Sequence, residues 1–86
     1  MPTICVFFGI IIRMFYRDHN PPHFHAEYQG QNATFDFDGK LLEGDIESRT
    51  AKDLIRKWAR RHKTELNKNW EHMRQKRPFT RIEPLK

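Results

Sequence analysis

The chain has 86 residues, of which 37% are hydrophobic and 31% are charged, and its formal net charge is +5. This balance predicts one folded domain spanning residues 1–86 and excludes a disordered chain. The single cysteine, Cys5, excludes an intrachain disulfide and a cysteine-based zinc site. The apolar residues 1–12 are too few to span a bilayer and lack a basic leader. We therefore expect a cytoplasmic protein without a membrane partner.

The positive charge is concentrated in the second half of the chain. Residues 44–86 contain thirteen Lys and Arg against six Asp and Glu, whereas residues 1–43 contain three against five. The basic half predicts an anionic partner, either RNA or an acidic protein. A solvated helix face would have the same composition, so this alternative stays open.

Two apolar runs open the chain, residues 3–8 and 10–17, and Gly9 between them predicts a tight hairpin. In the second run both faces of an extended strand carry apolar side chains, which is typical of a central strand. Asn20-Pro21-Pro22 then interrupts regular structure, because proline cannot donate a hydrogen bond to a sheet.

Residues 23–28 and 32–38 alternate polar and apolar side chains and predict a second hairpin. With a two-residue turn at Gly30-Gln31, His25 lies opposite Asp36, and His23 lies opposite Asp38, on the polar face. A three-residue turn would abolish this pairing.

Asp38-Gly39-Lys40 predicts a turn into a short strand at 41–43, and Ser48 or Thr50 predicts the start of a helix. Within residues 49–76, apolar side chains recur at helical spacing on one side and basic ones occupy the other. We predict one long amphipathic helix, with any bend near residues 62–64, followed by an extended tail at 79–85. This order predicts an α+β fold, in which the helix packs across a small antiparallel sheet of four or five strands.

A histidine cluster is the sharpest chemical signal in the sequence. His19, His23 and His25 follow the spacing H-x3-H-x-H. The last two point the same way on a strand, and the first arrives from the loop that contains both prolines. Three imidazoles suit a divalent metal such as zinc, nickel, manganese or iron, and an open coordination position would permit hydrolysis. The sequence predicts no cofactor other than this divalent metal. Metal binding is one of two chemical alternatives for the cluster.

The other alternative uses no metal. His23 or His25, oriented by Asp36 or Asp38, would act as a general acid or base near neutral pH. Glu27 is their neighbour on the same face. This set would suit cleavage of RNA by its own 2′-hydroxyl. Ordinary cross-strand pairs on a wet sheet face would need none of this chemistry. Two basic residues of the preceding strand would hold the phosphate, Arg13 and Arg17.

The predicted helix carries five Lys and Arg, and no acidic residue, between positions 56 and 63. This surface could follow a phosphate backbone or receive an acidic partner. Its basic residues are Arg56, Lys57, Arg60, Arg61 and Lys63.

Several stretches of the chain form a distinctive pattern. They are residues 7–16, Asp18-His19-Asn20-Pro21-Pro22-His23-Phe24-His25-Ala26-Glu27-Tyr28, Leu42-Glu43-Gly44, Trp58-Ala59, Leu66-Asn67-Lys68-Asn69-Trp70 and Ile82-Glu83-Pro84-Leu85. This pattern resembles the bacterial family called domain of unknown function 4160 over nearly the whole chain. The resemblance implies a small protein paired with a second one, in which this chain is the toxin and its partner is a small cognate antitoxin-like protein. The strongly basic helix departs from the family pattern, in which this helix more commonly carries acidic residues.

Two functions therefore stand as predictions. The first is the toxin component of a bacterial type II toxin–antitoxin pair, acting as a ribonuclease through the histidine-rich strand. The second is a non-enzymatic module that binds protein or nucleic acid and is stabilised by a metal.

Overall fold

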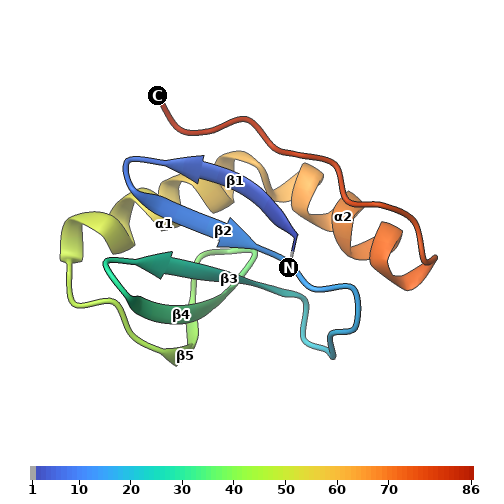
Figure 1. The fold of residues 1–86 in the computed structure, drawn as a ribbon, viewed down its shortest axis with the longest axis horizontal. Coiled ribbons are helices and arrows are strands. Elements are labelled where there is room, and N and C mark those ends of the chain that lie inside the picture. The colour runs from blue at the N-terminus through green and yellow to red at the C-terminus, as the bar shows by residue number, and fades with distance from the viewer. Residues whose placement is uncertain (1) are drawn as a thin grey trace.

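The computed structural model describes residues 2–86 and contains five strands followed by two helices (Figure 1). Each strand pairs antiparallel with the next, so the order across the sheet is β1-β2-β3-β4-β5. The predicted α+β fold with an antiparallel sheet is confirmed. The elements are β1 (Thr3–Phe7), β2 (Ile10–Arg13), β3 (His23–Tyr28), β4 (Gln31–Asp36), β5 (Leu41–Gly44), α1 (Arg49–Arg61) and α2 (Lys63–Arg74).

Tight turns join β1 to β2 and β3 to β4. Phe8 and Gly9 have φ angles of 49° and 77°, and Gln29 and Gly30 have φ angles of 48° and 78°. Positive φ at both central residues is the geometry of a type I′ turn, whose twist matches that of the flanking strands. The hairpin predicted at Gly9 is therefore present.

The predicted pairing of His25 with Asp36, and of His23 with Asp38, is wrong. His23 lies opposite Asp36, and His25 lies opposite Thr34. The turn falls one residue earlier than expected because a glutamine occupies its first position with positive φ, which residues other than glycine rarely adopt. The register moves by two residues, so each side chain stays on the face where the alternation placed it.

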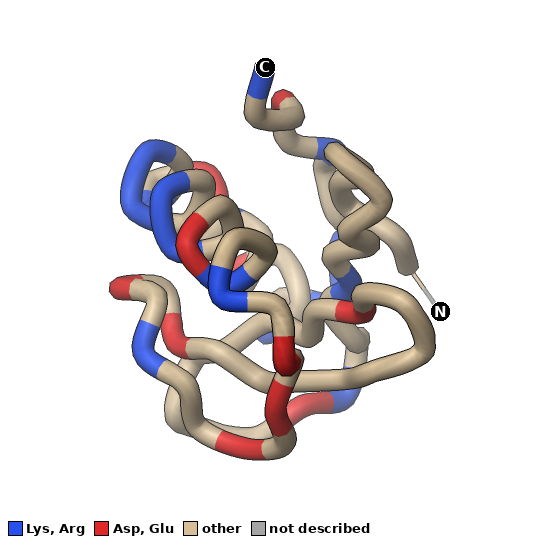
Figure 2. Tube along the Cα trace, turned by 90° about the vertical axis from the view of Figure 1, so that its left-hand side faces the viewer, with Lys and Arg blue, Asp and Glu red and all other residues tan. Residues whose placement is uncertain are grey.

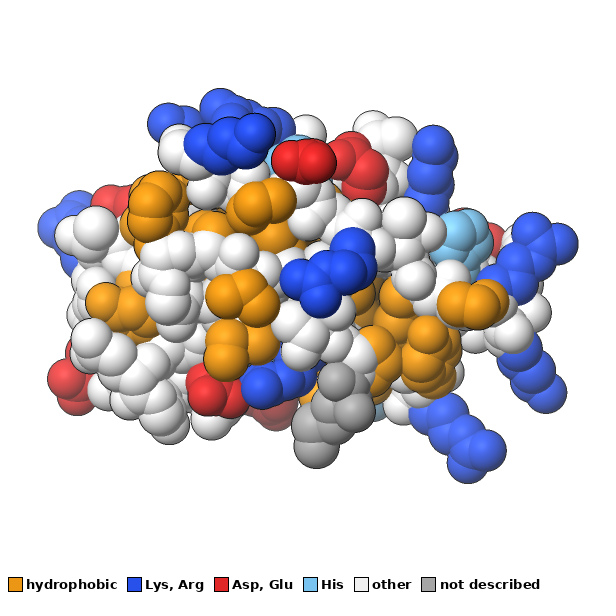
Figure 3. Space-filling view, turned by 45° about the horizontal axis from the view of Figure 1, so that its top comes forward, with side chains coloured by type: hydrophobic (Ala, Val, Ile, Leu, Met, Phe, Trp, Pro, Cys, Tyr) orange, Lys and Arg blue, Asp and Glu red, His pale blue; other side chains and the backbone are white. Residues whose placement is uncertain are grey.

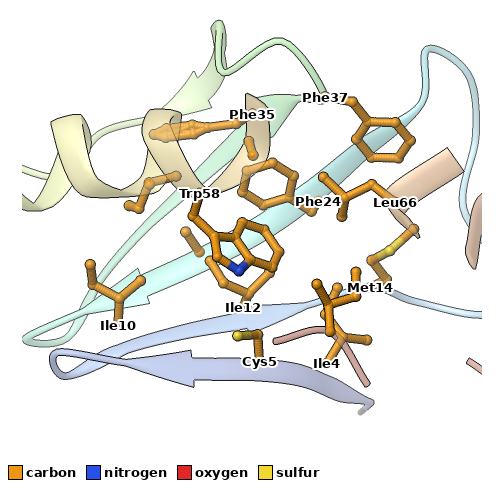
Figure 4. Close-up of a cluster of buried hydrophobic side chains, with 14 of the residues drawn as sticks. Ile4, Cys5, Ile10, Ile12, Met14, Phe24, Phe35, Phe37, Trp58 and Leu66 are labelled. Atoms are coloured by element: carbon orange, nitrogen blue, oxygen red, sulfur yellow. The ribbon is translucent and has the colours of Figure 1, made fainter. Parts of the chain in front are cut away.

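Alternation along the strands separates a buried face of the sheet from an open one. Ile10, Ile12, Phe24 and Phe35 on the buried face are fully buried. Trp58 of α1 packs on this face, with its ring centroid 5.6 Å from that of Phe24 (Figure 4). On the opposite face, the side chains of β2 and β4 are half-buried or exposed. The helices thus cover one face of the sheet and leave the other open.

Ser48 begins the helical part of the chain. Its hydroxyl oxygen accepts a hydrogen bond from the backbone N–H of Ala51 at 3.1 Å, so Ser48 rather than Thr50 is the N-cap. Buried side chains then recur along α1 at helical spacing: Ala51, Ile55, Trp58 and Ala59.

The prediction of one long helix is wrong, because the chain forms two. At His62 the backbone leaves helical geometry, with φ −111° and ψ 24°. The N–H of His62 still donates to the carbonyl of Trp58, and the N–H of Leu66 donates to the carbonyl of His62. The His62 ring bonds to the Glu65 carboxylate in the next turn. The break falls where a bend was expected. The hydrogen bond between His62 and Glu65 lies directly at the break.

Residues 79–85 form the extended tail that the sequence predicts, and they lie beside β1 without forming a strand (Figure 1). The N–H of Ile82 donates to the carbonyl of Ile4 at 2.9 Å. The side chain of Asn69 accepts a hydrogen bond from the N–H of Thr80 and donates one to its carbonyl, each at 2.8 Å. The tail is therefore fixed to both the sheet and α2.

Charge is distributed unequally between the two layers. Lys and Arg gather along the helices, and several Asp and Glu lie along the loops around β4 and β5 (Figure 2). No helix in residues 2–86 is long and apolar enough to cross a membrane.

The substitution Gly44→Ala should destabilise the fold more than Gly30→Ala. Both glycines have positive φ, where a side chain costs about 1–2 kcal/mol. A Cβ atom at Gly44 would also overlap the carbonyl oxygen of Asn32, whereas nothing lies within 4 Å of one at Gly30. We expect G44A to lower the free energy of unfolding by roughly 2–4 kcal/mol and G30A by about 1 kcal/mol, measured by urea denaturation. Equal losses would contradict the close approach of β5 to β4.

The substitution Glu65→Gln, at the junction of α1 and α2, should lower the stability of the fold near neutral pH. The hydrogen bond with His62 lowers the pKa of Glu65, and burial opposes this shift more weakly. Because the folded-state pKa lies below the unfolded one, the stabilisation is present above the ordinary pKa and is lost as the pH falls through the folded value. The side chain of Glu65 is 45% exposed, so we expect a loss below about 1 kcal/mol, measured by thermal unfolding across pH. A difference that persists in strong acid would show that the carboxylate charge is irrelevant.

Candidate metal centre

β3 and the loop before it bring three polar side chains together on the open face of the sheet. His23 and His25 are two residues apart on β3 and therefore start on the same face. The loop of residues 14–22 returns the chain from β2 to β3 and places the carboxylate of Asp18 against both rings.

One carboxylate oxygen contacts both histidines. Oδ2 of Asp18 lies 2.8 Å from Nε2 of His23 and 3.1 Å from Nε2 of His25. All three atoms lie within 4.8 Å of one another. The side chains of His23 and Asp18 are 4% and 12% exposed, while that of His25 is 33% exposed. The cluster is therefore shielded at His23 and accessible at His25.

The tautomer of His23 follows from its hydrogen bond to the backbone. Nδ1 lies 2.6 Å from the carbonyl oxygen of Pro21, and a carbonyl oxygen can only accept, so Nδ1 carries a hydrogen. In the neutral ring, Nε2 would then direct a lone pair at the Asp18 carboxylate. Two acceptors at 2.8 Å repel each other, so a cation belongs between them, either a proton on Nε2 or a metal ion.

Asp18 is ionised in this setting. Burial acts to raise its pKa, but the hydrogen bond with His25 and the positive charge of His23 outweigh burial and leave the pKa below its usual value. A carboxylate that stays charged near neutral pH satisfies one requirement of a metal ligand.

Packing fixes the orientation of both rings. The His23 ring lies 5.5 Å from the ring of Trp70, measured between centroids. The His25 ring meets Phe15 edge-on at 4.4 Å, and Thr34 Oγ1 lies 3.4 Å from its Nδ1. A hydrogen bond from the second ring nitrogen to a carbonyl, as His23 makes, is the usual way in which proteins orient a metal-binding imidazole.

The donor set suits a divalent transition metal. Ligand atoms at about 2.0–2.2 Å from one ion lie about 3 Å apart, close to the observed nitrogen–oxygen separations. Two imidazoles and one carboxylate leave coordination positions open for water or substrate. A pocket of about 260 Å³ adjoins the cluster, and its lining also includes His19 and Glu43. A larger hollow of about 530 Å³ on the open face shares His25, Thr34 and Glu43 with it.

Of the three histidines predicted as metal ligands, the structure brings His23 and His25 together and replaces His19 with Asp18. His19 is exposed and its Nδ1 lies 3.1 Å from the carbonyl of Asn20, although its ring is only 5.5 Å from that of His23. Asp18 directly precedes His19 in the sequence, and this position beside the histidines is the one sequence feature that indicates Asp18 as a ligand. Which of two neighbouring side chains turns inward depends on the path of the loop.

The predicted catalytic partners Glu27 and Asp36 lie on the right face but contact other groups. Glu27 pairs with Arg13 at 2.7 Å. Asp36 accepts hydrogen bonds from the N–H groups of Asp38 and Lys40 and so closes the turn before β5. His23 is too deeply buried to meet a substrate directly.

The predicted basic surface of α1 is partly occupied by structural contacts. Arg56 and Arg60 donate to the carbonyls of Gly39 and Asp38, and Lys63 pairs with the Asp38 carboxylate at 2.6 Å. These three side chains therefore hold the turn between β4 and β5 against the helix. Two residues of the predicted surface are exposed and have no ion pair among residues 2–86, Lys57 and Arg61.

Comparison with known proteins identifies a family. No curated protein and no solved structure matches the chain. The sequence profile of the family described as domain of unknown function (DUF4160) matches residues 9–71. This segment runs from the start of β2 into α2 and contains Asp18, His23 and His25. The chain therefore belongs to the DUF4160 family of domains of unknown function.

Proposed function

We propose that this protein binds a divalent transition metal at Asp18, His23 and His25 and uses it to cleave RNA. The observation that carries the proposal is the 2.8 Å approach of His23 Nε2 to the Asp18 carboxylate, while Nδ1 of the same ring is committed to a carbonyl. A metal ion between these atoms would remove their repulsion and supply positive charge for phosphodiester cleavage. A proton would also remove the repulsion, and metal titration distinguishes the two.

The open coordination positions would face the pocket that adjoins the cluster. There the metal would polarise a phosphoryl oxygen and stabilise its developing charge. The 2′-hydroxyl oxygen of the RNA would form the new bond to phosphorus as the bond to the 5′-oxygen breaks. The products would be a 2′,3′-cyclic phosphate and a 5′-hydroxyl, with solvent returning a proton to the leaving oxygen.

His19 supplies the base in this scheme. It lines the same pocket, and its Nδ1 donates to the carbonyl of Asn20, which leaves Nε2 of the neutral ring free to accept the 2′-hydroxyl proton. The roles assigned from sequence are therefore redistributed. His23 and His25 hold the metal with Asp18, and His19 moves the proton.

The proposal extends to the biological role through the family resemblance. We propose the toxin component of a bacterial type II pair, acting on RNA in the cytoplasm and held by a small antitoxin-like protein. The open face of the sheet, where the pocket and the larger hollow lie, would give such a partner a place to block the site.

A second candidate is a non-enzymatic module that binds a protein or nucleic acid and is stabilised by metal. Large hydrophobic side chains at the tip of the first hairpin favour it. Val6 is 47% exposed and Phe8 is 59% exposed. In that case, growth arrest on expression would survive loss of the metal ligands and would require the hairpin tip.

Titration with Zn²⁺, Ni²⁺, Co²⁺ and Mn²⁺ should show one bound ion per chain for at least one metal. Binding to the folded state should stabilise it by about 2.7 kcal/mol when the free metal is about 100 times the dissociation constant. D18N and H25A should weaken binding by at least the roughly 10-fold to 100-fold that loss of an outer-shell partner costs, because D18N removes the charge of one ligand and H25A removes another ligand. Calorimetry and thermal unfolding measure these effects.

The matched control is H19A, which removes a neighbouring histidine outside the cluster. It should bind metal like the unmodified chain. Loss of binding in H19A with retention in D18N would restore the three-histidine site that the sequence predicts. Absence of heat and of a stability shift with all four metals would leave a proton between Asp18 and His23.

Purified protein should cleave single-stranded RNA with metal and leave it intact with a chelator. H19A should retain the metal and lose activity by about 10²-fold to 10⁴-fold, as expected for removal of a general base. Gel analysis and mass spectrometry of the product ends measure the outcome. RNA left intact under every metal condition, or equal growth arrest by the H25A variant, would contradict the proposed enzyme.

A further inference from the structure

We infer that one end of the molecule, formed by the loop of residues 14–22 and the C-terminal end of α2, binds single-stranded nucleic acid. The choice of ligand rests on the proposed RNA cleavage, while the surface stands on its own geometry. We call this surface the basic end. It lines a pocket of about 500 Å³ and consists of Tyr16, Arg17, Met73, Arg74 and Lys76.

The basic end carries three cationic side chains, of which Arg74 is paired with Glu71 at 3.3 Å. Among residues 2–86, no Asp or Glu lines this pocket, and Arg17 and Lys76 make no ion pair. Figure 3 shows Lys and Arg side chains projecting from the end of the molecule where α2 finishes, with hydrophobic side chains between them. The dipole of α2 favours cations at its C-terminus. It does not account for Arg17, which comes from the loop.

An aromatic platform adjoins these charges. Tyr16 is 45% exposed and stacks on Phe79, with the ring centroids 4.2 Å apart and the planes 10° apart. Its hydroxyl oxygen accepts a hydrogen bond from the N–H of Phe79 at 3.0 Å, so the ring is held in place. Exposed aromatic rings beside Lys and Arg are the combination that binds unpaired bases and the phosphates between them. A base in a duplex has no free face, so the platform selects single strands.

Lys76 occupies a position where glycine would be more stable. Arg77 N–H donates to the carbonyl of His72 and Lys76 N–H donates to that of Met73, which is the Schellman ending of a helix. This ending requires positive φ at Lys76, and the angle is 58°. The chain thus places a lysine at a strained position that lines the pocket of the basic end.

The loop of residues 14–22 contributes to both the basic end and the metal centre. Arg17 lines the pocket of the basic end, and the next residue, Asp18, lines the pocket of the metal centre. A strand of nucleic acid bound along this loop would contact residues of both pockets, because adjacent Cα atoms are about 3.8 Å apart. By contrast, Arg56, Arg60 and Lys63 on α1 are engaged with the turn before β5.

Fluorescence anisotropy with a labelled oligouridine of about 12 nucleotides tests the surface. The protein is the H25A variant in chelator, so no cleavage occurs. Adding R17A and K76A should weaken binding about tenfold and reduce the slope of log affinity against log salt by about 1.4, because two phosphate contacts are lost. The control pair K57A and R61A removes the same charge from exposed positions on α1 and should change affinity less than about twofold.

A third variant separates binding from folding. K76G should raise the melting temperature by about 4–8 °C, because it relieves the positive φ, and should weaken oligouridine binding. An oligouridine–oligoadenosine duplex should bind more weakly than the single strand, and an oligothymidine that binds more weakly than oligouridine identifies RNA. Equal losses in the two double variants, or tighter binding of the duplex, would overturn the inference. Binding without cleavage in the unmodified chain would retain the surface and refute the enzyme.

Discussion

A five-stranded sheet has two faces, and this chain supplies enough helix to bury one of them. Trp58 and the apolar residues of β2, β3 and β4 remove that face from water, which is the main source of stability in so small a domain. The other face stays wet, so its side chains are free of the packing constraint. The polar cluster, the pocket and the larger hollow all lie on or beside this uncovered face.

His23 is the exception on the open face, because it is buried beside Trp70. Burial of an imidazole against a carboxylate is costly unless both groups are fully paired. Pro21, on one side of the ring, satisfies one nitrogen, and Asp18 faces the other. A cation, either a proton on Nε2 of His23 or a metal ion, therefore completes the site, and the fold already holds the three side chains close together. Such preorganisation lowers the cost of capturing an ion.

Periodicity predicts much of this structure, because apolar alternation and helical spacing are local properties. The strand with His23 and His25, the hairpin at Gly9 and the extended tail follow from it. The register of the second hairpin does not, because Gln29 takes a conformation that its side chain disfavours. The sequence also predicts the position of the break at His62, but only as a bend in one long helix, because apolar spacing continues through it.

The candidate site is less predictable than the fold. Asp18 and His19 are neighbours in the sequence, and only the path of the loop decides that Asp18 turns inward. The basic helix shows the same limit. Arg56 and Arg60 donate hydrogen bonds to backbone carbonyls of a distant turn. Every residue has a backbone carbonyl, so the amino-acid types at that turn do not indicate these contacts. Sequence shows which charges exist, whereas the fold shows which are already engaged.

The tail has a consequence for how the protein is made. Ile82 bonds to Ile4, and the carbonyl of Glu83 accepts the indole N–H of Trp58. A ribosome releases Ile4 well before Ile82, so β1 must wait for residues 79–85 before its outer edge is covered. Contacts between residues far apart in a sequence also slow folding, because a long loop must close first. During synthesis the unfinished chain exposes an apolar strand edge, and this interval is when a chaperone or a partner protein has most access to it.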